Sequence, residues 1–103
     1  MTSEPPCGVH KAVDLIGSKW TLLILHRLCS KAQGFNALLH GIDGINPRAL
    51  STRLKEMAEH GLVTKKVHPT SPPQVEYALT PQGAALKSII EQLGEWAVSL
   101  PSR

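Results

Sequence analysis

The sequence predicts a single domain of the α+β class that is mainly helical, and three observations lead to this prediction. Apolar residues recur at helical spacing from Val9 to Leu62 and again from Pro81 to Leu100. Between these stretches, two short runs alternate apolar and polar side chains with period two, as strands do. A length of 103 residues suits one domain with one core and is too short for two.

Three helices are expected in the N-terminal half, after a flexible lead over residues 1–8. Residues 9–16 form the first helix and residues 19–29 the second. The second helix has little polar surface, so we expect it to be the central buried helix. Residues 35–40 form a third, shorter helix, and residues 33–35 are a candidate short strand before it.

The fourth helix, expected over residues 46–62, has one apolar and one polar face. Its apolar stripe consists of Leu50, Leu54, Met57 and Ala58. Cationic and hydroxyl side chains without a carboxylate share the other face: Arg48, Ser51, Thr52 and Lys55. Asn46 and Pro47 suit its start, and Gly61 suits its end. This helix is suited to a DNA major groove, where short polar side chains approach the bases and cations meet phosphates or guanine edges.

The placement of charge supports a polyanionic partner. The net charge of +3 is modest, but five basic and only two acidic residues lie at positions 46–68. The rest of the chain is balanced, so this stretch holds the whole excess. Concentrated positive charge of this kind favours a polyanion over a merely solvated surface.

Two strands and a long helix complete the chain. The strands, at residues 63–68 and 75–79, are joined by a Pro-rich connection and form a hairpin. One helix is then expected over residues 81–100. Its long apolar stripe consists of Leu86, Ile89, Ile90, Leu93, Ala97 and Leu100, with Trp96 beside it.

This order of elements describes a winged helix-turn-helix with an additional helix at each end. Residues 47–60 would be the recognition helix and residues 63–79 the wing, within one DNA-binding domain over residues 9–100. Because so small a domain has little reason to expose a long amphipathic helix, a homodimer is the economical explanation. The expected interface residues are Val9, Val13, Leu86, Ile89, Ile90, Leu93, Trp96 and Ala97.

Several separated stretches resemble one known family. They are CGVHKAVDLIGSKW at 7–20, FNALL at 35–39, INPRALSTRLKEMAEHGLV at 45–63 and PPQVEYALTPQGAAL at 72–86. In this order they resemble the HxlR-type winged-helix transcription regulators, which are related to the MarR-type proteins. The resemblance covers residues 7–96. It implies a dimeric DNA-binding regulator, joined through its terminal helices, that represses or activates neighbouring genes.

The resemblance also implies site residues. The family's recognition helix matches residues 47–60, which carries DNA contact onto Arg48, Ser51, Thr52 and Lys55, and its wing matches residues 67–75. Arg53 and His60, at the flank of the helix, would contact phosphate or only solvent. Lys65 and Lys66 would contact the DNA backbone or remain simple surface residues.

The chain departs from the family pattern at three positions. Gln74 stands at the wing tip, and Gly34 before Phe35, where the family often has basic residues. Fewer wing contacts are therefore expected, and more of the binding should depend on the recognition helix. Thr52 replaces a bulkier side chain, so the operator sequence need not match those of relatives.

The two cysteines have different expected roles. Cys7 precedes the first helix beside His10 and Lys11, and positive charge nearby would raise its thiolate fraction. The resemblance implies oxidant or electrophile sensing at this cysteine, because some family members sense through a cysteine there. The alternative is that Cys7 packs at the edge of the dimer. Cys29 ends an apolar helix and is expected to be a small core residue.

Other classes of function have little support. Cys7 and His10 are one pair with no second pair of ligands, so no metal is expected, and no cofactor is expected either. No nucleophile elbow or phosphate-binding loop occurs, which argues against an enzyme. The sequence has neither a membrane span nor a secretory segment, so a cytoplasmic location is expected.

The resulting hypothesis is a homodimeric regulator, with repression as the expected effect, that binds double-stranded operator DNA. It would respond to an oxidant or electrophile at Cys7 or to a small effector. Two alternatives from other classes are a winged helix that binds an acidic protein partner and a thiol-dependent enzyme.

Overall fold

The computed structural model describes residues 8–101, so Cys7 lies outside the described residues. Six helices and three strands are present in this part of the chain. They are α1 (Gly8–Ile16), α2 (Lys19–Leu28), β1 (Gln33–Gly34), α3 (Phe35–Gly41), α4 (Pro47–Glu59), β2 (Val63–His68), β3 (Gln74–Leu79), α5 (Pro81–Ala84) and α6 (Lys87–Ser99). The mainly helical α+β winged helix-turn-helix predicted from the sequence is confirmed.

Side-chain caps fix the start of three helices. The Ser18 hydroxyl accepts from the backbone N–H of Trp20 at 3.2 Å at the start of α2. The Asn46 side chain accepts from Ala49 N–H at 2.8 Å at the start of α4. Thr80 caps α5 in the same way. Each cap satisfies a backbone donor that has no partner within the helix.

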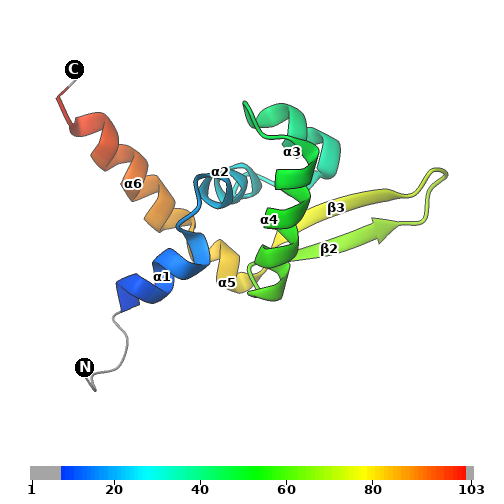
Figure 1. Ribbon diagram of the computed structural model, residues 1–103, viewed down its shortest axis with the longest axis horizontal. Coiled ribbons are helices and arrows are strands. Elements are labelled where there is room, and N and C mark those ends of the chain that lie inside the picture. The colour runs from blue at the N-terminus through cyan, green and yellow to red at the C-terminus, as the bar shows by residue number, and fades with distance from the viewer. Residues whose placement is uncertain (1–7, 102–103) are drawn as a thin grey trace.

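A small antiparallel sheet has the strand order β1-β3-β2. The predicted short strand is therefore present as β1, which pairs with β3 so that Gln33 lies opposite Tyr77. The β2–β3 pair forms the wing, which extends from the body on the side away from α1 and α6 (Figure 1).

The core lies among α2, α3, α4 and the base of the sheet. Its fully buried side chains are Ile24, Leu25, Leu38, Leu50, Leu54 and Met57. The central role expected for α2 is therefore correct. Because α4 buries three of these residues against α2 and β2, its opposite face must point to solvent.

The long C-terminal helix expected over residues 81–100 is wrong in one respect, because it is two helices. After α5 the chain turns at Ala85 and Leu86, where Leu86 N–H donates to the Gly83 carbonyl at 3.0 Å in a tighter, three-residue turn. Gly83 packs directly on the Leu62 carbonyl, which holds α5 against the body. The longer α6 then leaves the body and ends far from α1 (Figure 1).

Candidate nucleic-acid interface

The polar face of α4 consists of exposed side chains held on a rigid support. Opposite the buried Leu50 and Leu54, the exposed residues are Arg48, Ser51, Thr52 and Lys55. Among residues 8–101, neither Arg48 nor Lys55 takes part in an ion pair. Both cations are therefore available to an anionic partner, and the two hydroxyl groups beside them can approach a base edge.

Arg53 is placed differently from these four residues. Its guanidinium donates from Nη1 to Glu56 Oε1 at 2.7 Å, and its side chain is only 35% exposed. Its Nε is buried and has no hydrogen-bond partner among the described residues. The pair partly neutralises the charge of Arg53 at the flank of α4, so this arginine is less available to DNA than Arg48.

Two acidic residues of α4 were not included in the sequence-based description of the site. Glu56 forms the pair with Arg53, and the i, i+3 spacing could have predicted it. Glu59 is exposed four residues after Lys55, so it lies on the same face at the C-terminal end of the helix. The polar face therefore does contain a carboxylate. This carboxylate lies at the C-terminal end of α4, whereas Arg48 lies near the N-terminal end.

The wing divides its basic residues between two faces. Lys66 lies opposite Glu76 in the register, whereas Lys65 lies opposite the buried Tyr77. Adjacent strand residues point to opposite faces, so Lys65 and Lys66 cannot act as one patch. On the Lys66 face, His68 Nε2 lies 3.2 Å from Glu76 Oε1. The exposed Gln74 begins β3 and adds no charge there.

The residues expected at a dimer interface fall into two groups. Val9, Val13, Ile89, Leu93, Trp96 and Ala97 are exposed. Leu86 and Ile90 are half-buried and pack against the core of their own chain. These two residues therefore stabilise the fold of the subunit, a role that the apolar stripe alone does not indicate. Val98 is also exposed, although the predicted interface did not include it.

Cys29 is half-buried at the end of α2, rather than fully within the core. Burial raises the pKa of its thiol, with a smaller opposing effect from Lys87. A raised pKa lowers the thiolate fraction, so Cys29 is not poised for reaction. Among residues 8–101, no three His, Cys, Asp or Glu side chains come together as metal ligands.

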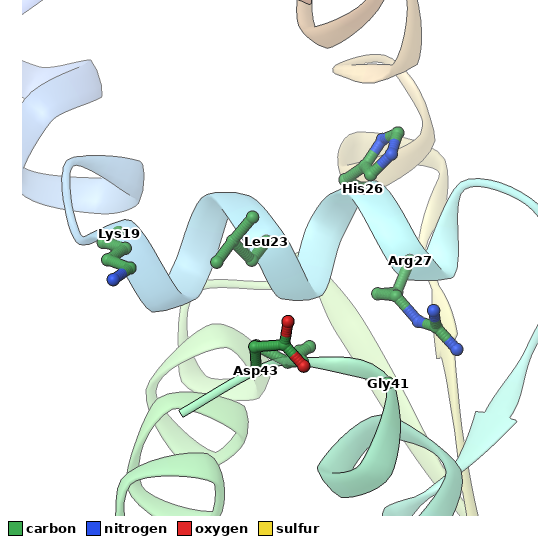
Figure 2. A pocket seen from close by; sticks show the side chains of 7 residues that line it. Lys19, Leu23, His26, Arg27, Gly41 and Asp43 are labelled. Atoms are coloured by element: carbon green, nitrogen blue, oxygen red, sulfur yellow. The ribbon is translucent and has the colours of Figure 1, made fainter. Parts of the chain in front are cut away.

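A cavity of about 440 Å³ separates α2 from the segment that follows α3. Lys19, Leu23 and Arg27 lie along its α2 side, and the Asp43 carboxylate points toward α2 from the other side (Figure 2). The cationic groups are spread along the helix, and a carboxylate stands among them. No part of this cavity is therefore lined by charges of one sign alone.

Comparisons with known proteins agree with this geometry. A family model described as HxlR-like helix-turn-helix matches residues 15–102. The HTH-type transcriptional regulator YvaP of Bacillus subtilis is 37% identical over 87 residues, which cover 84% of this chain and 81% of YvaP. None of the helices in the described part of the chain is long and apolar enough to cross a membrane.

Two solved structures are similar over almost their whole length. The redox regulator HypR in its oxidised form has a TM-score of 0.87 and 32% identity, covering 94% of this chain and 100% of HypR. A protein described as a MarR-family transcriptional regulator, from Porphyromonas gingivalis W83, has a TM-score of 0.89 and 33% identity. That match covers 98% of this chain and 99% of the other.

Proposed function

The chain belongs to the HxlR-like helix-turn-helix family of DNA-binding transcription regulators, and from this premise we propose that it is a homodimeric repressor of a pseudo-palindromic operator. In this proposal, α4 of each subunit enters the major groove of double-stranded DNA. The centres of the two half-sites would then lie about 34 Å apart or a multiple of that distance. Bound to an operator that overlaps a promoter, the dimer would exclude the polymerase.

One observation carries the DNA-binding part of the proposal. The exposed face of α4 presents Arg48 and Lys55 without ion pairs in the described chain, beside Ser51 and Thr52. Arg48 lies near the N-terminal end of the helix, the end whose residues commonly contact base edges in helix-turn-helix proteins. Base contacts would come from Arg48 and Thr52, and Lys55 would contact phosphate.

The test is operator binding by the double variant Arg48→Ala with Lys55→Ala, measured by fluorescence anisotropy at several salt concentrations. We expect a loss of about 1–3 kcal/mol of binding free energy for each contact, and a shallower salt dependence. Lys31→Ala is the control and should leave both nearly unchanged, because it removes an exposed cation that lies outside α4. Unchanged affinity and salt dependence in the double variant would exclude α4 as the DNA-binding face.

The response to a signal forms a second part of the proposal. Cys7, outside the described residues, is proposed to sense oxidants or electrophiles. The similarity to a redox regulator and the nearby His10 and Lys11 support this role. Oxidation should change operator affinity in the unaltered protein but not in Cys7→Ser. Non-reducing gel electrophoresis would reveal whether Cys7 bridges two chains, and a Cys7→Ser protein with an intact response would rule the sensor out.

The alternative is a winged helix that binds an acidic protein partner through the same face of α4. Retention on heparin would not separate the two proposals, because both predict a basic surface. A footprint on the DNA upstream of the neighbouring gene separates them. Sequence-specific protection supports the operator proposal, and purely nonspecific binding supports the protein partner.

A further inference from the structure

The turn that joins α3 to α4 is contacted at two points by side chains of the central helix α2. Residues 42–46 form this turn. Trp20, in the first turn of α2, packs against the core and lies beside Gly44, where an added Cβ would stand 3.7 Å from the ring carbon Cη2. Arg27, about two helical turns further along α2, lies against Gly41 at the end of α3. The path of the chain from α3 to α4 is therefore supported by α2.

Arg27 reaches the backbone of α3 because Gly41 has no side chain. A Cβ on Gly41 would overlap the guanidinium group, whose atoms Cζ and Nη2 are the nearest. The Arg27 side chain extends from α2 toward the segment that contains Gly41 (Figure 2). The absence of a Cβ therefore leaves the space that the planar guanidinium fills.

Two hydrogen bonds with Gln33 fix the orientation of Arg27. Arg27 Nη2 donates to Gln33 Oε1 at 3.3 Å, and Gln33 Nε2 donates to the Arg27 carbonyl at 2.8 Å. Gln33 is buried in β1, opposite Tyr77 of β3. Arg27 therefore joins α2, the end of α3 and the sheet at one place.

Ion pairing does not explain an arginine at this position. Neither of the ion pairs formed among residues 8–101 includes Arg27, and its Nε is buried without a hydrogen-bond partner in that part of the chain. A buried donor without a partner costs free energy of folding, which a shorter apolar side chain would avoid. What arginine provides here is the length and planar shape that reach both Gly41 and Gln33.

The turn transmits the position of α3 to the start of α4. Ile42 and Ile45 are both buried, so the turn is packed into the core and cannot bend freely. Packed interiors pass a displacement on to their neighbours instead of absorbing it. A shift at Gly41 therefore moves the first turn of α4, where Arg48 lies. Arg27 itself is behind this helix, because α2 packs against the buried face of α4.

We propose that Arg27 is a positioning residue for DNA binding, which sets the placement of α4 without contacting DNA. This inference rests on the proposed function, in which the exposed face of α4 enters the major groove. A hydrogen bond to a base edge weakens steeply outside a narrow range of distance and angle. Phosphate contacts by flexible cations depend less on the exact position of the helix. Loss of Arg27 should therefore reduce specific affinity more than nonspecific affinity.

Two variants remove the same contact from opposite sides. Arg27→Met keeps an unbranched apolar side chain and removes the guanidinium. Gly41→Ala keeps the arginine but displaces its guanidinium, which can move at little cost because it is the end of a flexible side chain. Each variant should weaken operator binding about fivefold, as expected for one weakened base contact. Binding to a random duplex and its salt slope should be nearly unchanged, because no phosphate contact is lost.

The double variant tests whether the two substitutions act through one contact. Arg27→Met combined with Gly41→Ala should lower operator affinity no further than either substitution alone, whereas independent effects would multiply. Lys31→Met, which removes an exposed cation outside the contact, is the matched control and should bind the operator normally. Thermal unfolding midpoints should fall by no more than about 8 °C, and circular dichroism checks that each variant is folded in the assay.

A measurement without DNA separates the positioning role from the proposed function. In the ¹⁵N-labelled free protein, Arg27→Met and Gly41→Ala should both shift the amide signals of residues 45–49, and Lys31→Met should not. If the unaltered protein binds no operator, the proposed function fails, while these shifts still decide whether Arg27 holds the turn. Unshifted signals at residues 45–49, or multiplied losses in the double variant, would overturn the positioning role. Equal losses of specific and nonspecific binding would also overturn it, because they would assign Arg27 to stability alone.

Discussion

Two glycines beside the end of α4 are required for different physical reasons. Gly61 has a φ of +76°, in the left-handed region that glycine adopts without cost and that commonly ends a helix. A Cβ at this position would meet no other atom within 4 Å. Gly83 has ordinary helical geometry, but a Cβ there would overlap the Leu62 carbonyl oxygen. The first glycine is constrained by its backbone and the second by its packing.

This difference predicts unequal effects of alanine at the two positions. Gly61→Ala should lower the free energy of unfolding by about 1 kcal/mol, the cost of a left-handed backbone for alanine. Gly83→Ala should lower it by about 2–3 kcal/mol, because backbone atoms must separate and α5 must shift. Urea unfolding followed by tryptophan fluorescence measures both. A Gly83→Ala protein as stable as Gly61→Ala would show that α5 is not held by this contact.

Tyr77 predicts how stability depends on alkaline pH. Burial against the core raises the pKa of its phenol above the ordinary value, because the interior disfavours the charged form. As the pH rises past about 10, the unfolded chain loses this proton first, so the free energy of unfolding should fall. Below that pH the contribution is fully present. Tyr77→Phe should flatten the decline between pH 9 and 11 in thermal unfolding, and an unaltered decline would show that Tyr77 is not its cause.

At the scale of elements, the sequence predicts a helix correctly where residues within that helix determine its start and its buried face. Helical spacing and the caps at Ser18, Asn46 and Thr80 placed α2, α4 and the start of α5 within a few residues. The break between α5 and α6 has no local signal, because neither a proline nor a helix-ending glycine stands at Ala85 or Leu86. The contact of Gly83 with Leu62 just before it joins residues that are distant in the sequence. Likewise, the apolar stripe predicted over residues 81–100 does not reveal that Leu86 and Ile90 pack against the core of their own subunit.

For the candidate site, the sequence predicts which residues lie on the polar face but not which residues they pair with. The four polar residues of α4 follow from periodicity alone, because a buried stripe determines the opposite face. Net charge alone does not locate the acidic residues: Glu56 pairs with Arg53, and Glu59 lies on the polar face at the C-terminal end of α4. The opposite orientations of Lys65 and Lys66 follow from strand period, yet their exact partners, Tyr77 and Glu76, required the register.

The weakly charged wing leads to a prediction about the hairpin as an element. Gln74→Lys adds a cation on the face that already contains Lys66 and His68, where Glu76 is the opposing charge. If the wing reaches the DNA backbone, operator affinity should rise several-fold and the salt slope should steepen by up to about one unit. Ser30→Lys, which adds the same charge at an exposed turn, is the control. Equal effects of the two variants would show that only net charge matters and that the wing makes no contact.

At the scale of the whole molecule, the proposed binding surfaces lie on different sides. The wing projects from one side of the body, whereas α1 and α6 project from the other (Figure 1). Apolar side chains are concentrated on these terminal helices: Val9 is 65% exposed and Trp96 is 61% exposed. An unpaired subunit would leave a large apolar surface in water, which soluble monomers rarely do. A second copy of the chain would cover it and leave both α4 helices accessible.

The proposed dimer predicts that oligomeric state and tight operator binding are lost together. Leu93→Glu with Trp96→Glu places two charges on the exposed stripe of α6, outside the buried core. Analytical ultracentrifugation should then report a monomer, with helical content retained in circular dichroism. Affinity for a two-half-site operator should fall at least tenfold, whereas binding to an isolated half-site should be nearly unchanged, because each α4 is intact. Glu95→Gln, on the opposite face of α6, should remain dimeric. A double variant that still sediments as a dimer would place the interface elsewhere.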